Sequence, residues 1–115
     1  MDGEITAPEL ERALADAEPL VVDIRDPASF ARGHITDSVN IPLARLPTEI
    51  PRVADADHVV TVCPHGKASV RAARLIASFD GFDGRVESLA CGLEGWDGPT
   101  DTDSADANDP PEAPF

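Results

Sequence analysis

Positive charge is scarce in this chain of 115 residues. Lysine and arginine together number 9, against 22 aspartates and glutamates, so the formal net charge is -13, and Lys67 is the single lysine. A surface this acidic repels nucleic acids and anionic membranes, which are themselves negative. We therefore expect neither a nucleic-acid partner nor a membrane partner. A small anionic substrate would need a place where this charge is locally reversed.

Long apolar runs are also missing. No stretch approaches the roughly 20 residues that cross a bilayer. The first residues, MDGEIT, lack the basic and apolar regions of a secretory signal. These absences predict a cytoplasmic protein.

Cysteine is limited to Cys63 and Cys91. Two cysteines do not make a disulfide framework, and thiols in the cytosol usually stay reduced. Together with three histidines, they show none of the tight spacings that are typical of metal ligands, so we expect no metal site.

Aromatic residues make up only 4% of the chain. Few aromatics, scarce lysine and abundant aspartate resemble the composition of proteins from salt-accumulating halophiles. At about 1 M salt the Debye length is only about 3 Å, so the self-repulsion of such a chain is largely screened. We expect activity and stability to rise with salt. The alternative is an ordinary acidic cytosolic protein.

The length and a hydrophobic fraction of 42% fit one packed domain. The composition changes after Trp96, because residues 97–115 hold six acidic residues and four prolines but no lysine or arginine. We expect one domain over residues 1–97 and a disordered acidic tail over residues 98–115.

Apolar periodicity predicts strands that alternate with helices. Strands are expected at 20–24, 38–41, 58–62 and 86–89, and helices from Thr6 onward, at 26–33 and at 70–79. Between Leu43 and Ile50 we expect a short helix or turn that Pro47 and Pro51 interrupt. This alternation predicts an α/β fold with a parallel sheet, whose ligands bind at the carboxyl ends of the strands.

The segment CPHGKAS, residues 63–69, carries the strongest chemical pattern. Cys63 ends a buried strand, and a short loop then turns into a helix. The backbone N–H groups of residues 65–69 and the amino end of the helix can converge on the sulfur, which favours the nucleophilic thiolate. Ser69 is expected to cap this helix.

The surroundings of this segment are basic. Residues 58–79 contain no aspartate or glutamate, and they hold Lys67, Arg71, Arg74, His58 and His65. Nearby cations lower the pKa of a thiol and attract anions. The alternative for Cys63 is a buried structural thiol, and the alternative for the basic stretch is a solvated helix face.

Three motifs resemble those of the rhodanese-like domain family, and most closely its small single-domain thiosulfate sulfurtransferases. They are DIRDPASFARGHI with VNIP at 23–35 and 39–42, CPHGKAS at 63–69, and SLACGLEGW at 88–96. Their order and spacing match over roughly residues 4–97.

This resemblance implies a five-stranded, mostly parallel sheet with helices on both faces. It implies that Cys63 takes a sulfane sulfur from thiosulfate or a related small anionic donor as a persulfide, and passes it to cyanide, a thiol or a protein acceptor. No metal or organic cofactor is implied. The substrate-binding loop would be Pro64, His65, Gly66, Lys67, Ala68 and Ser69, and the supporting residues would be Asp23, Arg25 and Arg71.

The chain departs from the family pattern at Ala68 and Cys91. Many family loops carry arginine at position 68, so a bidentate anion clamp is missing. Either Lys67 compensates as a point charge or the natural donor is not thiosulfate. Cys91 replaces the first glycine of a pair. It is either a small residue tolerated in a tight turn or a redox partner of Cys63, since neighbouring strands lie about 4.8 Å apart.

Two other function classes are alternatives to this interpretation. Cysteine phosphatases and arsenate reductases need arginine six positions after the cysteine, where this chain has Ser69, and Arg71 comes two positions later. A non-catalytic protein-binding or redox-sensing module of the same family is the main alternative to an enzyme.

Overall fold

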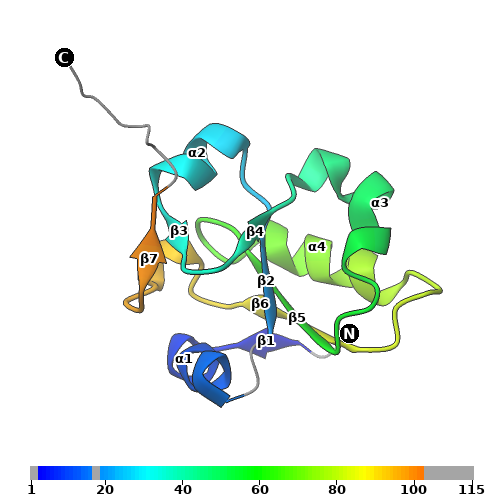
Figure 1. Ribbon diagram of the computed structural model, residues 1–115, viewed down its shortest axis with the longest axis horizontal. Coiled ribbons are helices and arrows are strands. Elements are labelled where there is room, and N and C mark those ends of the chain that lie inside the picture. The colour runs from blue at the N-terminus through cyan, green and yellow to red at the C-terminus, as the bar shows by residue number, and fades with distance from the viewer. Residues whose placement is uncertain (1–2, 17–18, 103–115) are drawn as a thin grey trace.

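A computed structural model describes residues 3–16 and 19–102 of the chain (Figure 1). Five strands form one sheet in the order β1-β6-β5-β2-β4, and every neighbouring pair is parallel. Their bounds are β1 Glu4–Ile5, β2 Leu20–Asp23, β4 Val39–Asn40, β5 His58–Val62 and β6 Arg85–Leu89. The predicted α/β class and parallel sheet are confirmed.

The helices lie between these strands. They are α1 Ala7–Asp16, α2 Pro27–Arg32, α3 Leu46–Glu49 and α4 Ala68–Ala77, with 3-10 turns η1 Leu43–Arg45, η2 Ile50–Arg52 and η3 Leu93–Gly95. Helix α1 starts where the sequence predicts, because Thr6 and Glu9 form a reciprocal capping box. The Thr6 N–H donates to Glu9 Oε1 at 2.9 Å, and the Glu9 N–H donates to Thr6 Oγ1 at 3.3 Å.

Apolar residues of the strands alternate between two cores, one on each face of the sheet. Val22 and Val59 pack with Leu46 of α3 and with α4 on one face. Val21 and Val60 pack with α1 and Trp96 on the other. Figure 1 shows α1 on one side of the sheet and α3 and α4 on the opposite side. The expectation of helices on both faces is therefore confirmed.

The segment after β4 is divided into three short helical pieces, η1, α3 and η2, in line with the predicted interruptions, and the second and third of them begin one residue before Pro47 and Pro51. Each proline occupies one of the first two positions of a short helix, α3 or η2. Proline fits there because its fixed φ is helical and its missing N–H has no intrahelical partner to lose. The helix predicted over residues 70–79 is α4, which begins earlier, at Ala68, and ends at Ala77, before Phe79.

The first residues of the predicted tail belong to a second, two-stranded sheet. Strand β7, Thr100–Asp101, pairs antiparallel with β3, His34–Ile35. The Trp96 Nε1–H also donates to the Pro99 carbonyl at 3.2 Å. The expected boundary between domain and tail, after residue 97, therefore leaves β7 on the tail side, although β7 pairs with β3 of the domain. Residues 103–115 of the expected tail lie outside the described residues.

The sheet register brings the chemistry-bearing segments to one edge. Asp23 pairs with Val62, and Thr61 pairs with Ser88, so β2, β5 and β6 end side by side. The Ile24 N–H donates to the Val62 carbonyl at 3.0 Å, which continues the ladder to the position just before Cys63. No helix in the described part of the chain is long and apolar enough to cross a membrane.

Candidate active site

Cys63 lies at the carboxyl end of β5 with its sulfur enclosed by the following loop. The residue is 2% exposed. Its Sγ accepts hydrogen bonds from the Gly66 N–H at 3.1 Å and from the Ser69 N–H at 3.3 Å. The Ser69 Oγ lies 3.4 Å from the same sulfur. The backbone of the loop therefore converges on Cys63, as the strand–loop–helix pattern predicts.

The loop is held in this shape by the turn that follows β6. The Leu93 N–H donates to the Cys63 carbonyl at 2.8 Å, and the Glu94 N–H donates to the Pro64 carbonyl at 3.1 Å. Gly66 has a φ of 83°, which favours glycine, and a Cβ there would overlap the backbone of Ala90. Backbone hydrogen bonds from the turn after β6 therefore hold the loop that encloses the Cys63 sulfur.

Ser69 does not cap helix α4, contrary to the sequence expectation. Lys67 precedes the first helical residue and makes no side-chain cap. Ser69 lies inside the first turn and is fully buried. Its hydroxyl lies 2.6 Å from the Ser88 Oγ, besides its contact with the sulfur. The hydroxyl therefore faces the nucleophile instead of the free N–H groups of its own helix.

Two opposing effects set the acidity of Cys63. Burial of the sulfur raises the pKa, because a buried thiolate loses water. Hydrogen bonds from the Ser69 side chain and from the N–H groups of Ser69, His65 and Gly66 lower it, and together they prevail. The pKa of Cys63 therefore lies below the ordinary thiol value, and a larger fraction of the sulfur is the nucleophilic thiolate at neutral pH.

The basic surroundings of Cys63 are narrower than the stretch 58–79. His65, Lys67 and Arg71 are exposed in the loop and in the first turn of α4. His58 begins β5, at the far end of the strand from Cys63, and its Nε2 lies 2.7 Å from Glu87 Oε1. The local positive charge at the site therefore comes from the loop and the start of α4.

An acidic side chain also reaches the loop from the turn after β6. The Nδ1 of His65 lies 3.6 Å from Glu94 Oε1, and both side chains are largely exposed. This contact places one carboxylate at the rim of the loop. Lys67 and Arg71 are the lysine and the arginine nearest to Cys63 in the sequence.

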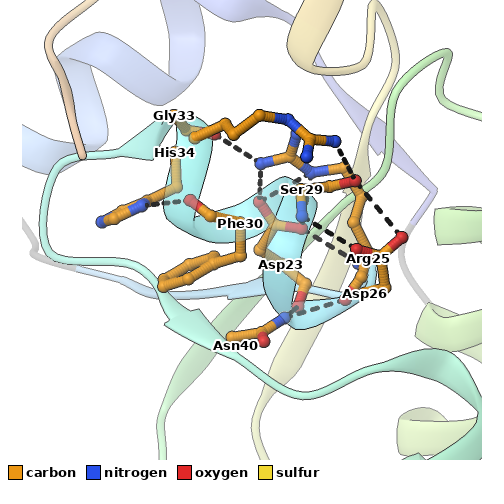
Figure 2. A network of polar contacts seen from close by, with 9 residues as sticks. Asp23, Arg25, Asp26, Ser29, Phe30, Gly33, His34 and Asn40 are labelled. Atoms are coloured by element: carbon orange, nitrogen blue, oxygen red, sulfur yellow. Dashed lines mark hydrogen bonds and ion pairs between the residues drawn. The ribbon is translucent and has the colours of Figure 1, made fainter. Parts of the chain in front are cut away.

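Asp23, the last residue of β2, forms an ion pair with Arg25 (Figure 2). Arg25 Nη2 lies 2.7 Å from Asp23 Oδ2, and its Nε lies 3.0 Å from Oδ1. The same Nη2 donates to the Gly33 carbonyl at 2.6 Å. Asn40 Nδ2 donates to the carbonyls of Asp23 and Arg25 at 3.0 and 2.9 Å. This network fixes the backbone that follows β2 at the functional edge of the sheet.

Cys91 lies in the turn after β6 and is exposed. Its thiol donates to the Gly92 carbonyl at 3.2 Å. Cys63 and Cys91 are both free thiols. Among residues 3–16 and 19–102, no three side chains of the metal-binding types form a group that could hold an ion.

Sequence reasoning missed two residues of this neighbourhood, Ser88 and Asn40. Both appear in the sequence as polar residues within short strands. Both lie within the family motifs, VNIP and SLACGLEGW, but their side-chain partners come from other elements, so the motifs did not predict their contacts. The alternation of inward and outward positions along β6 was the one signal that could have marked Ser88 as buried.

Comparison with known proteins agrees with this geometry. The model of the family described as Rhodanese-like domain matches residues 6–98. The chain is 42% identical over 90 residues to the thiosulfate sulfurtransferase GlpE of Stutzerimonas stutzeri, covering 77% of this chain and 80% of that protein. It is 43% identical over 104 residues to GlpE of Pseudomonas aeruginosa, covering 88% of this chain and 92% of that protein.

A solved structure shares the fold over most of its length. The human single-domain sulfurtransferase TSTD1 superposes with a TM-score of 0.71 at 25% identity, covering 81% of this chain and 93% of that one. Fold, motif order and close relatives therefore agree. The chain belongs to the rhodanese-like domain family.

Proposed function

We propose that this protein is a thiosulfate sulfurtransferase that carries a sulfane sulfur on Cys63. The observation that carries the proposal is the enclosed sulfur of Cys63, which accepts two backbone N–H groups and lies beside the Ser69 hydroxyl. Such a cradle stabilises an anionic sulfur, as both the thiolate and the persulfide are. The relatives named thiosulfate sulfurtransferase support the same conclusion.

The first half-reaction loads the enzyme. The Cys63 thiolate attacks the outer sulfur of thiosulfate and forms a new sulfur–sulfur bond. The bond between the two sulfurs of thiosulfate breaks, and its electron pair leaves on sulfite. The product is a Cys63 persulfide anion, which the N–H groups of the loop stabilise by hydrogen bonds. No oxidant or reductant is consumed.

The second half-reaction unloads the enzyme. A nucleophilic acceptor such as cyanide attacks the outer sulfur of the persulfide, and the electron pair returns to Cys63 as the thiolate. A small thiol or a protein thiol can accept the sulfur in the same way. Lys67 and Arg71 provide the positive field that draws anionic donors to an otherwise acidic molecule.

Ala68 bears on the choice of donor. The methyl group of Ala68, the exposed first residue of α4, cannot form the bidentate contact that arginine makes with an oxyanion. We infer that thiosulfate binds through the backbone cradle and the point charge of Lys67. Donors with a smaller anionic group, such as low-molecular-weight persulfides, then compete well with it.

The proposed setting of the enzyme is the cytoplasm of a salt-tolerant cell. Two free cysteines suit a reducing compartment. The net charge of -13 suits a medium in which salt screens self-repulsion.

Intact-mass analysis combined with turnover tests the proposed function. The protein is incubated with thiosulfate, mercaptopyruvate or a persulfide donor, at low salt and at about 1 M salt. We expect Cys63 to gain one sulfur atom and cyanide then to be converted to thiocyanate, faster at high salt. A protein that gains no sulfur from any donor but still binds a protein partner would be the non-catalytic module instead.

Cys91 is proposed as a redox partner of Cys63, because β5 and β6 are adjacent and both cysteines follow those strands at the same edge. Mild peroxide is expected to join the two sulfurs in a disulfide, with two waters formed and the transfer activity lost until a thiol reductant is added. Peptide mass spectrometry without reduction detects the bond, and Cys91→Ser is the matched control that cannot form it. Two free thiols after peroxide would show that Cys91 is only a small residue of its turn.

A further inference from the structure

Three polar side chains form a buried line that leads away from the nucleophile. The Ser69 Oγ lies 3.4 Å from the Cys63 sulfur and 2.6 Å from the Ser88 Oγ. Ser69 and Ser88 are both 0% exposed, so water does not compete for their hydroxyl groups. The nucleophile is therefore connected to strand β6 through two hydroxyls that no solvent reaches.

The direction of these hydrogen bonds follows from the partners available. Within the described residues, the Ser88 hydroxyl has one hydrogen-bond partner, Ser69 Oγ. A buried hydroxyl hydrogen without an acceptor is costly, so the Ser88 O–H donates to Ser69. The hydrogen of Ser69 is then left to point at the sulfur, which as a thiolate is the strongest acceptor within reach.

The number of hydrogens favours the thiolate. The line Cys63–Ser69–Ser88 contains two contacts. With a thiolate it also contains two hydrogens, one from each hydroxyl, and both find an acceptor. With a protonated thiol there are three hydrogens for two contacts, so one hydrogen in a dry environment lacks an acceptor.

We propose that Ser88 is a positioning residue that turns the Ser69 hydroxyl toward the Cys63 sulfur. It acts in two ways. Its donated hydrogen bond occupies a lone pair of Ser69 and polarises the Ser69 O–H, which makes that hydroxyl a better donor. It also holds Ser69 away from the competing acceptor of a helical serine, a backbone carbonyl one turn earlier. The inference rests on the proposed function, since it concerns the reactive form of Cys63.

Other charges near the sulfur are unaffected by a change at position 88. The charged or titratable side chains near Cys63 include Asp23 at the end of β2 and Arg25 after it, His65 and Lys67 in the loop, Arg71 and Arg74 on α4, and Cys91 and Glu94 after β6. Glu87, next to Ser88, is directed to His58 and Arg85. Removal of the Ser88 hydroxyl alters none of these contacts.

The test is the pH profile of Cys63 alkylation by iodoacetamide, measured in a Cys91→Ser background so that one thiol reports. Ser88→Ala is expected to raise the Cys63 pKa by about 0.5 to 1 unit. Ser69→Ala is expected to raise it at least as much. Ser88→Thr keeps the hydroxyl and is expected to restore the original value.

A double-mutant cycle separates positioning from simple packing. In the Ser69→Ala background, Ser88→Ala is expected to cause no further rise in the pKa, because the hydroxyl through which it acts is gone. If Ser88→Ala is too unstable to titrate, Ser88→Val and Ser88→Thr form a pair of equal shape that suits a strand and differs by the hydroxyl. The valine variant then takes the place of alanine in the cycle.

The possible results distinguish this inference from the proposed function. Two results would overturn the role of Ser88. One is a Cys63 pKa in Ser88→Ala that stays within about 0.2 unit of the original. The other is a pKa shift from Ser88→Ala that is equally large in the original and in the Ser69→Ala background. The expected pKa shifts in a protein that transfers no sulfur would uphold Ser88 and overturn the sulfurtransferase proposal. Alkylation reads the thiolate directly and needs no sulfur donor.

Discussion

Replacement of Cys63 by serine is expected to lower the conversion of thiosulfate and cyanide to thiocyanate by about 10⁴-fold or more, and to abolish the mass gain of one sulfur. Serine keeps the size of the side chain and its place beneath the loop. Its hydroxyl remains protonated at neutral pH, and an oxygen cannot form the persulfide. The comparison is made by steady-state turnover and by intact mass after incubation with thiosulfate.

The matched control is Cys91→Ser, the same chemical change at an exposed cysteine whose sulfur is directed to the Gly92 carbonyl. It is expected to keep sulfur transfer within a few-fold of the original. A Cys63→Ser protein that still gained sulfur, with Cys91→Ser inactive, would move the nucleophile to Cys91. The role of the cradle around Cys63 would then have to be abandoned.

Replacement of Arg25 by leucine is expected to destabilise the fold by about 3–5 kcal/mol. The Asp23 carboxylate is 1% exposed and the Arg25 side chain 13% exposed. Without the guanidinium the carboxylate stays buried with the Arg25 backbone N–H as its remaining hydrogen-bond partner among the described residues. The Gly33 carbonyl also loses its donor. Urea unfolding monitored by Trp96 fluorescence measures the change.

Arg45→Leu is the matched control, because it makes the same substitution in an ion pair at the surface. Arg45 is 69% exposed and lies 3.4 Å from Glu49. Its loss is expected to cost about 0.5 kcal/mol or less. The double variant Asp23→Asn with Arg25→Leu is expected to recover part of the lost stability, since no unpaired charge is then buried. An equal loss in the free energy of unfolding for Arg25→Leu and Arg45→Leu would show that the buried ion pair of Asp23 stabilises the fold no more than a surface pair does.

The nucleophile and its loop were predictable from the sequence for a local reason. Cys63 follows an apolar run that is typical of a buried strand. Gly66 then predicts a turn, and the apolar spacing from Val70 onward predicts a helix. A chain that leaves a parallel strand and enters a helix brings successive N–H groups together. Short-range geometry alone therefore places donors around the sulfur.

The role of Ser69 was mispredicted because a serine near a helix start is ambiguous. Capping is a local property, so the sequence favours it. The contact with Ser88 arises only when β6 takes its place next to β5, with Thr61 opposite Ser88. Burial on that side removes water and makes the sulfur and the second hydroxyl better partners than the end of the helix.

The small sheet of β3 and β7 could not be predicted either. Each strand has two residues, too few for a periodic signal, and β7 lies within a segment whose composition suggests disorder. The pairing depends on Trp96, which is buried against the body and brings the following residues to β3. A composition average over residues 97–115 hides this local anchor.

By itself, the sequence determined the α/β class, the position of Cys63 after a buried strand, the loop that surrounds its sulfur and the excess of basic residues in that segment. These features depend on contacts between residues close together in the chain. Tertiary structure decided which cations lie near the sulfur, since β5 carries His58 to the opposite end of the strand from Cys63. It also decided that Ser88 meets Ser69, and that Asn40 closes the loop after β2. Those contacts join residues 15 to 19 positions apart, and only the packing of α4 against β6 and the pairing of β4 with β2 bring them within hydrogen-bond distance.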